Sequence, residues 1–515
     1  MQIETAKKTF TVDMLEREYW WGGCVHDGSR MPFHAATEFY RQVDPNSTTN
    51  PANPFFVSSK GRYIWSGDGF DYDIKNGRIN LLYTRAKPEL YDGFGTLRGA
   101  FLAAGKKHFP PSGKSPDEFF FTHPQYNTWI EFIYGQNQTG ILEYAKSILD
   151  NGLPPGILMI DDKWSKYYGD YEFDKEKFPN PKELIARLHE MGFKVMLWVV
   201  PFITSDSEEY RDLRDAGLIV RDREGLPAMR DWWNGYGAIL DFTNPKAVAW
   251  FDRRLRNLME KYGVDGFKFD GGDSVFLRDD DKTHTGASAL EQSKAFCEYG
   301  LNFDFNEFRA GYKLAGQALV YRLCDKFHSW ESDNGIGALV PNMLAMGILG
   351  YPYTCPDMIG GGSWLDFVGE KLDRLDQELF VRYAGCSALM PMMQFSAAPW
   401  RVLDEKHSDI CKRMAGLHGS YKELIIKLVR HAKLTGEPIV RNMEYVFPGQ
   451  GLEEVTDQFM LGDNVLAAPV FTKGTFRRTV RLPAGNWEYN GEIIDGGRNF
   501  EIDCPIDQLA VFIRL

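Results

Sequence analysis

The segment PKAVAWFDRRLRNLMEKYGVDGFKFDGGD, residues 245–273, joins a helical pattern to a short aromatic strand that ends in aspartate. From residue 118 onward, short β-branched or aromatic runs alternate with helical patterns in the same way. Each parallel strand needs a crossover to return to the same end of a sheet, so the alternation predicts a (β/α)8 TIM barrel, with a doubly wound sheet as the alternative. The eight candidate strands are residues 127–132, 156–162, 194–200, 266–270, 318–325, 351–357, 386–394 and 437–443.

Two β-rich regions flank the predicted barrel. Before it, short alternating runs are separated by Gly, Asn, Pro and Asp, and a Pro/Gly/Ser stretch at residues 110–116 predicts a linker. After residue 443, short strand patterns and turns return. We therefore expect an α/β protein with an N-terminal β-rich domain at residues 1–117, the catalytic barrel at 118–443 and a small C-terminal β-sandwich at 444–515.

The composition is that of a globular protein with an acidic surface. Of the 515 residues, 43% are hydrophobic and 25% are charged, and the net charge is −12. An acidic surface repels phosphate groups, and no cluster of Lys and Arg opposes it, so neither nucleic acid nor a membrane is an expected partner. The 13 Trp and 24 Tyr suit flat polar ligands such as sugars.

The sequence has no feature that predicts export. No run of 18 apolar residues occurs, and residues 1–10 lack the apolar core of a signal peptide. The seven cysteines are scattered without a C-x-x-C pair, which predicts neither a disulfide framework nor a zinc site but buried thiols in a reducing compartment. We therefore expect a cytoplasmic protein.

Charged side chains gather where the predicted strands end, which in a barrel is the end that holds the active site. These residues are Asp161, Asp162, Lys268, Asp270, Asp273, Arg322, Asp325 and Asp357, with Trp164 and Trp198 beside them. So many carboxylates at one mouth raise the free energy unless a ligand, a metal or protonation compensates for their repulsion.

Three chemistries could use such a mouth. None of these residues is His, so no transition metal is expected, whereas Mg²⁺ and Ca²⁺ stay open. Phosphate chemistry would need a glycine-rich nest or basic residues, and the glycines at 360–362 follow an aspartate and indicate a tight loop. Glycoside hydrolysis needs two carboxyl groups across one bond, and it also needs aromatic walls. This mouth supplies both.

Nine short motifs occur along the chain, and both their residues and their order are informative. They are YNTWIE at 126–131, QNQ at 136–138, DDKW at 161–164, WWNGY at 232–236, GFKFDGGD at 266–273, GYP at 350–352, PDMIGG at 356–361, DQFMLGD at 457–463 and LPAGNW at 482–487. This set resembles glycoside hydrolase family 31, and the first, second and fourth motifs are most similar to the branch that contains the myogenesis-regulating glycosidase and bacterial α-galactosidases. The resemblance implies retaining, exo-acting hydrolysis of an α-linked glycoside or oligosaccharide without a cofactor.

The resemblance also implies the catalytic residues. Asp270 matches the nucleophile of the family, and Lys268 lies on the same side of that strand, where it would lower the pKa of Asp270 or hold a sugar hydroxyl. Most of the family has an Arg near the end of strand five, followed by Trp-x-Gly-Asp with the acid/base as its last residue. Here Arg322 precedes Trp-Glu-Ser-Asp, so Asp333 is the predicted acid/base. Asp325, at the end of an apolar strand, is the alternative.

The other residues at the mouth are expected to bind the terminal sugar. Carboxylate and guanidinium groups pair well with vicinal hydroxyls, and indole rings form apolar walls. The expected binding residues are Asp161, Asp162, Trp164, Trp198, Trp232, Trp233, Lys268, Asp273, Arg322, Trp330 and Asp357, the last as a support for Arg322.

One departure from the family bears on specificity. Many α-glucosidases of the family have a His shortly after the seventh strand, and the run QFSAAPW at 394–400 has none. The sequence therefore favours an α-galactosidase. The alternatives are an α-glucosidase, an α-xylosidase, an α-N-acetylgalactosaminidase, a transglycosylase and a non-catalytic sugar-binding relative.

Overall fold

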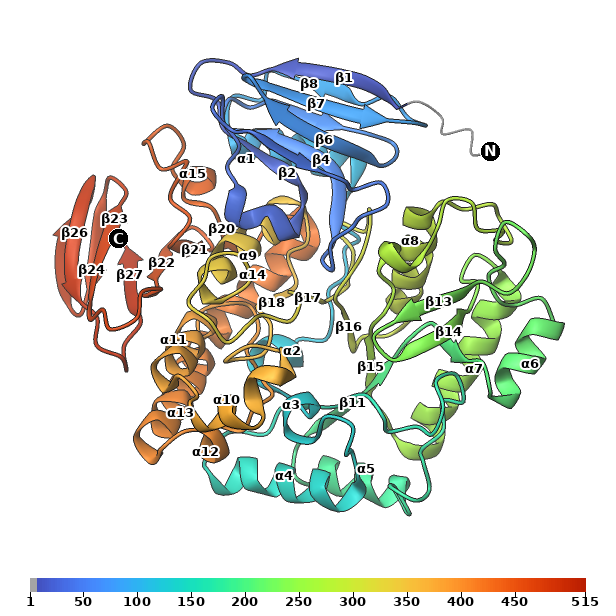
Figure 1. Ribbon diagram of the computed structural model, residues 1–515. Coiled ribbons are helices and arrows are strands. Elements are labelled where there is room, and N and C mark those ends of the chain that lie inside the picture. Colours follow the sequence, from blue (N-terminus) through green and yellow to red (C-terminus); the bar gives the residue numbers. More distant parts are fainter. Residues whose placement is uncertain (1–6) are drawn as a thin grey trace.

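The N-terminal region is built from two antiparallel sheets of four strands each, in a computed structural model that describes residues 7–515 (Figure 1). One sheet has the order β1 (Lys8–Asp13), β7 (Arg78–Tyr83), β6 (Phe70–Lys75) and β3 (Phe39–Arg41). The other has the order β2 (Trp20–Cys24), β4 (Ala52–Ser58), β5 (Tyr63–Trp65) and β8 (Glu89–Tyr91). Helix α1 (Leu97–His108) follows and packs against β4 and β5. The predicted N-terminal β-rich region is therefore confirmed.

Eight parallel strands form the central barrel, as predicted. In chain order they are β9 (Gln125–Asn127), β10 (Ile157–Ile160), β11 (Lys194–Val199), β15 (Gly266–Phe269), β16 (Asn306–Phe308), β17 (Tyr321–Arg322), β18 (Thr354–Cys355) and β19 (Gln394–Phe395). Neighbours in the chain are neighbours in the sheet, except that β19 pairs with β9. A parallel bridge between Met358 and Gln394 closes the ring, so every strand end points to one mouth.

Helices surround the barrel. The longer ones are α4 (Gln138–Asp150), α5 (Pro181–Glu190), α6 (Glu208–Asp215), α7 (Pro245–Tyr262), α8 (Ala289–Tyr299), α9 (Leu339–Ile348), α11 (Gln377–Ser387), α13 (Glu405–Ser420) and α14 (Lys422–Thr435). Helix α7 begins at the side-chain cap of Asn244 with proline in its first turn, and it ends at Gly263, whose φ is +88°. Its buried residues recur every three or four positions, which turns one face toward the barrel.

The fifth barrel strand, β16, was not among the predicted strands, and this shifts the numbering of those that follow. Its residues Asn306 and Glu307 are polar yet fully buried, so the segment lacks an apolar run. Glu307 accepts from Gln394 of β19, and Asn306, on the opposite face, bonds to the backbone oxygens of Phe303 and Ala318. Arg322 therefore ends the sixth strand rather than the fifth, and Asp357 follows the seventh. The prediction that residues 437–443 form the eighth barrel strand was wrong. Strand β20 (Val440–Arg441), which lies within them, pairs with the C-terminal sheet instead.

A three-stranded antiparallel sheet is inserted between the third and fourth barrel strands. It has the order β12 (Phe202–Thr204), β14 (Gly235–Ile239) and β13 (Met229–Trp232). Its turn contains Trp233 and Asn234, and a small hydrophobic cluster that includes Trp198, Phe202 and Trp232 joins it to the end of β11. The insertion thus holds the turn beside the barrel mouth.

The C-terminal region is an antiparallel β domain with a core of its own, as predicted. Six strands have the order β20, β21 (Phe459–Leu461), β22 (Val465–Ala468), β27 (Ala510–Arg514), β24 (Asn486–Tyr489) and β25 (Glu492–Asp495), and a ribbon is formed by β23 (Arg477–Leu482) and β26 (Arg498–Asp503). Trp487 and Phe512 are fully buried in the core between them. The domain limits at 117/118 and 443/444 stay a proposal.

Two further observations concern the chain as a whole. All seven cysteines are buried free thiols, as the sequence predicted. Within residues 7–515, no helix has both the length and the apolar composition that crossing a bilayer requires.

Candidate active site

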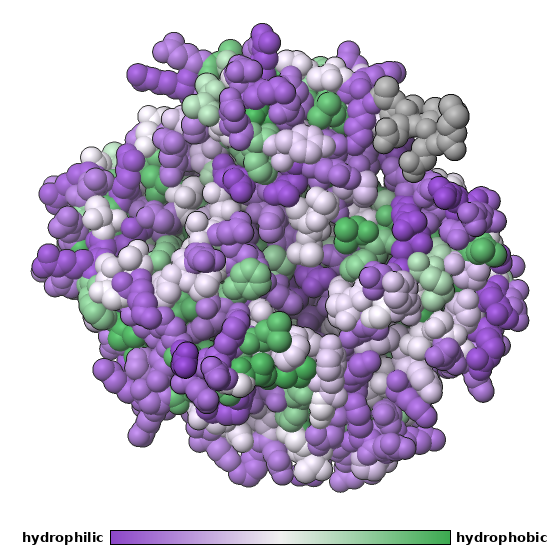
Figure 2. Space-filling model, in the orientation of Figure 1, coloured by the Kyte–Doolittle hydropathy of each residue, from purple (hydrophilic) through white to green (hydrophobic). Residues whose placement is uncertain are grey.

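A cavity of about 390 Å³ opens at the carboxyl ends of the barrel strands. Figure 2 shows a hollow near the middle of the face it draws, with hydrophilic residues in its depth. Four aspartates and three cations line the cavity, and aromatic rings surround them. The lining residues are Trp129, Tyr134, Asp161, Asp162, Trp198, Trp233, Lys268, Asp270, Arg309, Arg322, Asp325, Met358 and Trp364.

Asp270 follows β15 and is fixed by donors on both of its carboxylate oxygens. Trp198 Nε1 donates to Oδ2 at 3.0 Å, and the backbone N–H of Gly271 donates to Oδ1 at 2.9 Å. The guanidinium of Arg309 lies 3.4 Å from Oδ1. These contacts hold the carboxylate in one orientation toward the cavity.

The charges around Asp270 keep it ionised. Burial by itself would raise the pKa of this carboxyl, but the positive charges of Arg309, Lys268 and Arg322, with the Trp198 hydrogen bond, outweigh burial and bring the pKa down to about 2. The carboxylate is therefore negatively charged over the whole range in which enzymes usually work, as a nucleophile requires.

Lys268 and Asp161 form a buried ion pair in the cavity. Lys268 Nζ lies 2.7 Å from Asp161 Oδ2, and both side chains are about 5% exposed or less. The backbone N–H of Asp161 donates to the hydroxyl of Thr128 at 2.9 Å, which ties the end of β10 to that of β9. Although burial opposes it, the charge of Asp161 raises the pKa of Lys268, so the ammonium stays protonated beside the substrate space.

Asp162 is held by the segments beyond it. The hydroxyl of Tyr168 donates to its Oδ1 at 3.0 Å, and Asn234 Nδ2 donates to its Oδ2 at 2.7 Å. The Oδ1 of Asn234 in turn accepts from the hydroxyl of Tyr134 at 3.0 Å. Burial raises the pKa of Asp162 to about 6, against the opposing charge of Lys163. This carboxyl therefore titrates within the range in which many enzymes are assayed.

Arg322 connects two carboxylates at the opposite wall. Its Nη1 lies 2.8 Å from Asp325 and 2.5 Å from Asp357. Asp357 is fully buried and also accepts from the backbone N–H of Lys326 at 2.8 Å, so it supports Arg322 without lining the cavity. The side chain of Asp325 is 39% exposed and does line the cavity.

Asp333 lies away from the cavity. It is exposed, in a turn that precedes α9, and it is not part of the cavity lining. The side chain of the neighbouring Asn334 contacts Asp325 instead: its Nδ2 donates to the backbone oxygen of Asp325 at 2.9 Å. Of the two candidate acids, the structure brings only Asp325 into the cavity that contains Asp270.

Arg309 is the main residue of the cavity that the sequence analysis missed. It follows β16, and its Nη2 lies 3.1 Å from Asp273, which is buried behind the cavity wall. Its guanidinium also packs on the ring of Trp233 at 5.0 Å. The sequence analysis assigned the family pattern of an Arg near the end of strand five to Arg322, because β16 has no apolar run by which it could be recognised as the fifth strand.

Only two of the tryptophans that were predicted to form walls line the cavity. Trp198 and Trp233 line the cavity, together with Trp129, Tyr134 and Trp364, which were not predicted as binding residues. Three other tryptophans do not line it. Trp164 donates to the backbone oxygen of Trp198 at 2.7 Å within the core, Trp232 stacks on Phe202, and Trp330 donates to Asp376 at 3.0 Å.

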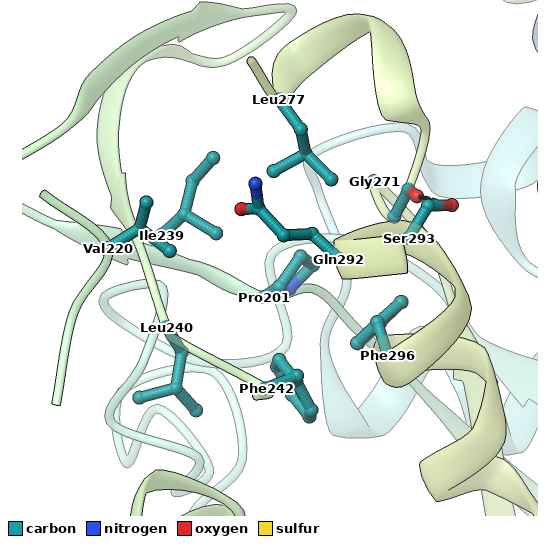
Figure 3. A pocket seen from close by; sticks show the side chains of 11 residues that line it. Pro201, Val220, Ile239, Leu240, Phe242, Gly271, Leu277, Gln292, Ser293 and Phe296 are labelled. Atoms are coloured by element: carbon teal, nitrogen blue, oxygen red, sulfur yellow. Dashed lines mark hydrogen bonds between the residues drawn. The ribbon is translucent and has the colours of Figure 1, made fainter. Parts of the chain in front are cut away.

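A much smaller cavity lies behind the loop that follows Asp270. It measures about 20 Å³, which is space for one water molecule. Figure 3 shows Gly271 and Ser293 on one side of it, with Leu240 and Phe242 among the apolar residues around it. The Ser293 hydroxyl donates to the backbone oxygen of Gly272 at 2.6 Å, so α8 supports the loop. This cavity is too small for a sugar.

Within residues 7–515, no group of three or more His, Cys, Asp or Glu is arranged to hold a metal ion. The arrangement of the cavity nevertheless has a clear chemical capacity: an ionised carboxylate and a second, solvent-accessible carboxylate face one space with charged and aromatic walls.

Comparison with known proteins agrees with this arrangement. Residues 120–322 match the glycosyl hydrolases family 31 TIM-barrel domain, and residues 436–515 match the family 31 C-terminal domain. The myogenesis-regulating glycosidase of Mus musculus is 36% identical over 410 residues, which are 78% of this chain and 57% of that protein. Alpha-glucosidase 2 of Bacillus thermoamyloliquefaciens is 25% identical over 74% of this chain and 51% of its own length.

The chain thus spans little more than half the length of these two relatives. Among solved structures, the family 31 dextranase of Flavobacterium johnsoniae, complexed with glucose, superimposes with a TM-score of 0.84 at 19% identity, over 99% of this chain and 67% of that one. At that identity the superposition confirms the fold alone. The two domain matches together cover more than half of the sequence, and the chain belongs to glycosyl hydrolase family 31.

Proposed function

We propose that the protein is a retaining, exo-acting α-glycosidase that releases a terminal sugar through a covalent intermediate on Asp270. The main support is the pairing of Asp270 and Asp325 in one cavity. Asp270 is ionised and fixed by Trp198 and Gly271, whereas Asp325 is open to solvent and can exchange protons. A cavity of 390 Å³ closed by barrel strands suits the end of a saccharide rather than the middle of a chain.

The reaction follows from these positions. Asp270 attacks the anomeric carbon as the bond to the leaving oxygen breaks, and Asp325 gives that oxygen its proton. Asp325, now ionised, takes a proton from water, and the hydroxide so formed displaces Asp270 from the anomeric carbon. Two inversions retain the α configuration, and both carboxyl groups return to their starting states.

We assign the acid/base role to Asp325 rather than to Asp333. The acid must reach the leaving oxygen in the same space that holds the nucleophile, and only Asp325 lines that space. Its carboxylate is oriented by Arg322 at 2.8 Å, an arrangement that keeps it beside the cavity. Asp333 is left with a position in an exposed turn.

We further propose galactose as the released sugar. Selection for an axial O4 needs polar groups that would be left unpaired by an equatorial hydroxyl. Asp161, Asp162 and Trp233 lie on one wall and offer such groups, and Trp232 lies behind Trp233. In the run 394–400, which has no His, Gln394 is buried and bonds to Glu307 at 3.1 Å, so it is turned into the barrel and away from a sugar.

The test is a panel of 4-nitrophenyl α-glycosides of galactose, glucose, xylose and N-acetylgalactosamine, with proton NMR of the first-formed sugar. We expect the α-galactoside to give a kcat/KM at least about 100-fold above that of the α-glucoside, and an α-anomer as the first product. A preference for glucose or xylose would overturn the sugar assignment alone. An initial β-anomer would overturn the retaining mechanism, and inactivity on every substrate would favour a sugar-binding role.

A further inference from the structure

A second cavity, of about 190 Å³, lies beside the catalytic one. It is formed by the loop after β10, by β12 and by the β13–β14 turn, so most of its wall comes from the inserted sheet. Its volume equals that of about six water molecules, which suits a single ring or a small charged group rather than an oligosaccharide. We call it the side cavity. Its lining residues are Lys163, Lys166, Tyr167, Tyr168, Phe202, Ile203, Thr204, Trp232, Asn234, Tyr236 and Gly237.

The side cavity is positively charged in a protein whose net charge is −12. Lys163 and Lys166 line it, and its lining contains no Asp or Glu. Within residues 7–515, neither lysine forms an ion pair with a carboxylate at 4 Å or less. The catalytic cavity differs, since four aspartates line it beside its three cations. Two unpaired ammonium groups over one hollow create a local potential that attracts anions.

Lys163 is held in an unusual conformation. Its φ is +71°, in the left-handed region that non-glycine residues rarely adopt. Its ammonium lies 4.2 Å from the ring centre of Tyr168, and its backbone oxygen accepts from Lys177 Nζ at 3.0 Å. Burial lowers the pKa of Lys163, against the attraction of Asp162. A strained, partly desolvated cation at the edge of a cavity is a feature typical of binding sites.

Aromatic rings complete the side cavity. Tyr236 is 68% exposed and Tyr167 is 40% exposed, although both are large side chains that burial would favour. Lys166 Nζ lies 5.5 Å from the ring centre of Tyr167, and Trp232 forms part of the floor. Flat faces next to ammonium groups can pack against a sugar ring while the cations bind a substituent on that ring.

Only one layer of side chains separates the two cavities. Tyr168 and Asn234 line the side cavity, and both donate to Asp162, which lines the catalytic cavity. Asn234 also accepts from Tyr134 on the catalytic side. Asp162 and its two donors are therefore a wall that the catalytic cavity and the side cavity share.

We propose that the side cavity binds a carboxylate or sulfate group carried by the substrate, so that acidic glycosides are preferred over their neutral counterparts. This inference rests on the proposed glycosidase function. The anionic group belongs either to the sugar that is released or to the leaving group. In both cases Lys163 and Lys166 supply the charge-assisted hydrogen bonds, and the tyrosine rings exclude water around them.

The experiment uses two matched pairs of substrates built on the sugar that the 4-nitrophenyl panel selects. In one pair the leaving group is glucose or glucuronate, and in the other the released sugar is neutral or oxidised to the acid at C6. We expect one acidic member to have a kcat/KM about tenfold above that of its neutral partner, the scale of one charge-assisted hydrogen bond. The pair that shows the difference identifies the source of the anion. Raising the ionic strength should shrink the difference.

The variant Lys163→Gln/Lys166→Gln should abolish that preference. Lys166→Gln alone keeps the charge beside Asp162, so it should weaken the preference and leave kcat/KM for neutral substrates unchanged. Lys175→Gln is the matched control, because Lys175 is exposed and lies outside both cavities. Equal kcat/KM values within both pairs would overturn the inference. So would a loss of the preference for acidic substrates in Lys175→Gln that equals the loss in the double lysine variant.

Calorimetric binding of the same four compounds to Asp270→Asn separates this inference from the proposed function. Tighter binding of an acidic member, lost in the double lysine variant, supports the side cavity even if no substrate is hydrolysed. Hydrolysis of neutral glycosides without any preference for the acids, in rate or in binding, refutes the side cavity and leaves the proposed function intact.

Discussion

Arg309 Nη2 lies 3.4 Å from Asp270 Oδ1 and 3.1 Å from Asp273 Oδ2. The ring of Trp233 covers the guanidinium at 5.0 Å. One cation thus joins the proposed nucleophile to a buried carboxylate and to an aromatic wall, and it comes from a barrel strand that has almost no sequence signature. The ionisation of Asp270 depends on it more than on any other positive charge.

Replacing this cation should change the pH profile. The pKa of Asp270 is about 2, so in the wild type the ascending limb of kcat/KM should lie at or below pH 3. Arg309→Gln removes the charge that lowers the pKa of Asp270 most, so this pKa should rise. The ascending limb should then move upward by one pH unit or more, and each unit corresponds to about 1.4 kcal/mol of lost interaction with the ionised carboxylate. The measurement is kcat/KM on the preferred 4-nitrophenyl glycoside between pH 2.5 and 8.

Arg309→Lys is the control for this prediction, since it keeps the charge but loses the planar fork. Its ascending limb should stay near that of the wild type even if the rate falls. If Arg309→Gln lowers the rate equally at every pH, Arg309 acts on substrate binding and does not set the ionisation of Asp270.

The acid/base assignment predicts opposite results for two aspartates. Asp325→Ala should lower kcat/KM by about 10² to 10⁴ and flatten the descending limb of the pH profile, because the proton donor is gone. Asp333→Ala should stay near wild type, since Asp333 is exposed and outside the cavity. Azide added to Asp325→Ala should restore turnover and give an α-glycosyl azide, because azide needs no general base. The reverse pattern would return the role to Asp333.

The sequence predicted the barrel, and the strand that leads to Asp270, for a physical reason. Asp270 ends β15, a strand whose aromatic residues are buried on the outer face of the sheet, so its run is apolar and easy to detect. In β16, by contrast, the buried residues include two polar side chains whose hydrogen bonds are satisfied inside the protein. Asn306 donates to two backbone oxygens, and Glu307 accepts from Gln394. A search for apolar runs therefore cannot detect this strand.

Which aspartate faces the cavity could not be predicted from spacing alone. Both Asp325 and Asp333 follow β17, and the choice depends on how the chain turns between them. Gly361 and Gly362 let the loop after β18 approach residues 325–328 closely, and a β-carbon at Gly362 would meet the Cα of Asp325 at 3.1 Å. That packing between distant segments places Asp325 at the mouth. The indoles of Trp164 and Trp330 were likewise assigned to walls, but each found a hydrogen-bond acceptor elsewhere.

Asp162 should make stability depend on pH. Its folded pKa of about 6 lies above the ordinary value of 3.8, so the folded state keeps this proton longer than the unfolded chain does. The associated stability is fully present below pH 4 and is lost as the pH rises through 6. Asp162→Asn carries no charge, so relative to the wild type it should gain up to about 3 kcal/mol in unfolding free energy between pH 4 and pH 8.

Urea unfolding of both proteins at several pH values measures this difference. The amide of Asn234 can rotate to offer its oxygen to the new side chain, so the substitution keeps its hydrogen bonds. A difference between the two proteins that stays constant from pH 4 to pH 8 would show that Asp162 titrates alike in both states.

The stability of the loop that follows Asp270 should depend on Ser293. Its hydroxyl donates to the backbone oxygen of Gly272 at 2.6 Å, in a buried setting two residues beyond Asp270. Ser293→Ala leaves that oxygen without its donor, which should cost about 1 to 3 kcal/mol of unfolding free energy. Ser420→Ala is the matched control, because the Ser420 hydroxyl makes a similar bond of 2.7 Å to Leu417 on an exposed helix end. There, water replaces the lost donor, and the change should stay within about 0.5 kcal/mol. Equal losses in the two variants, measured by urea unfolding at one pH, would mean that the Ser293 bond gives the loop no support beyond that of a surface contact.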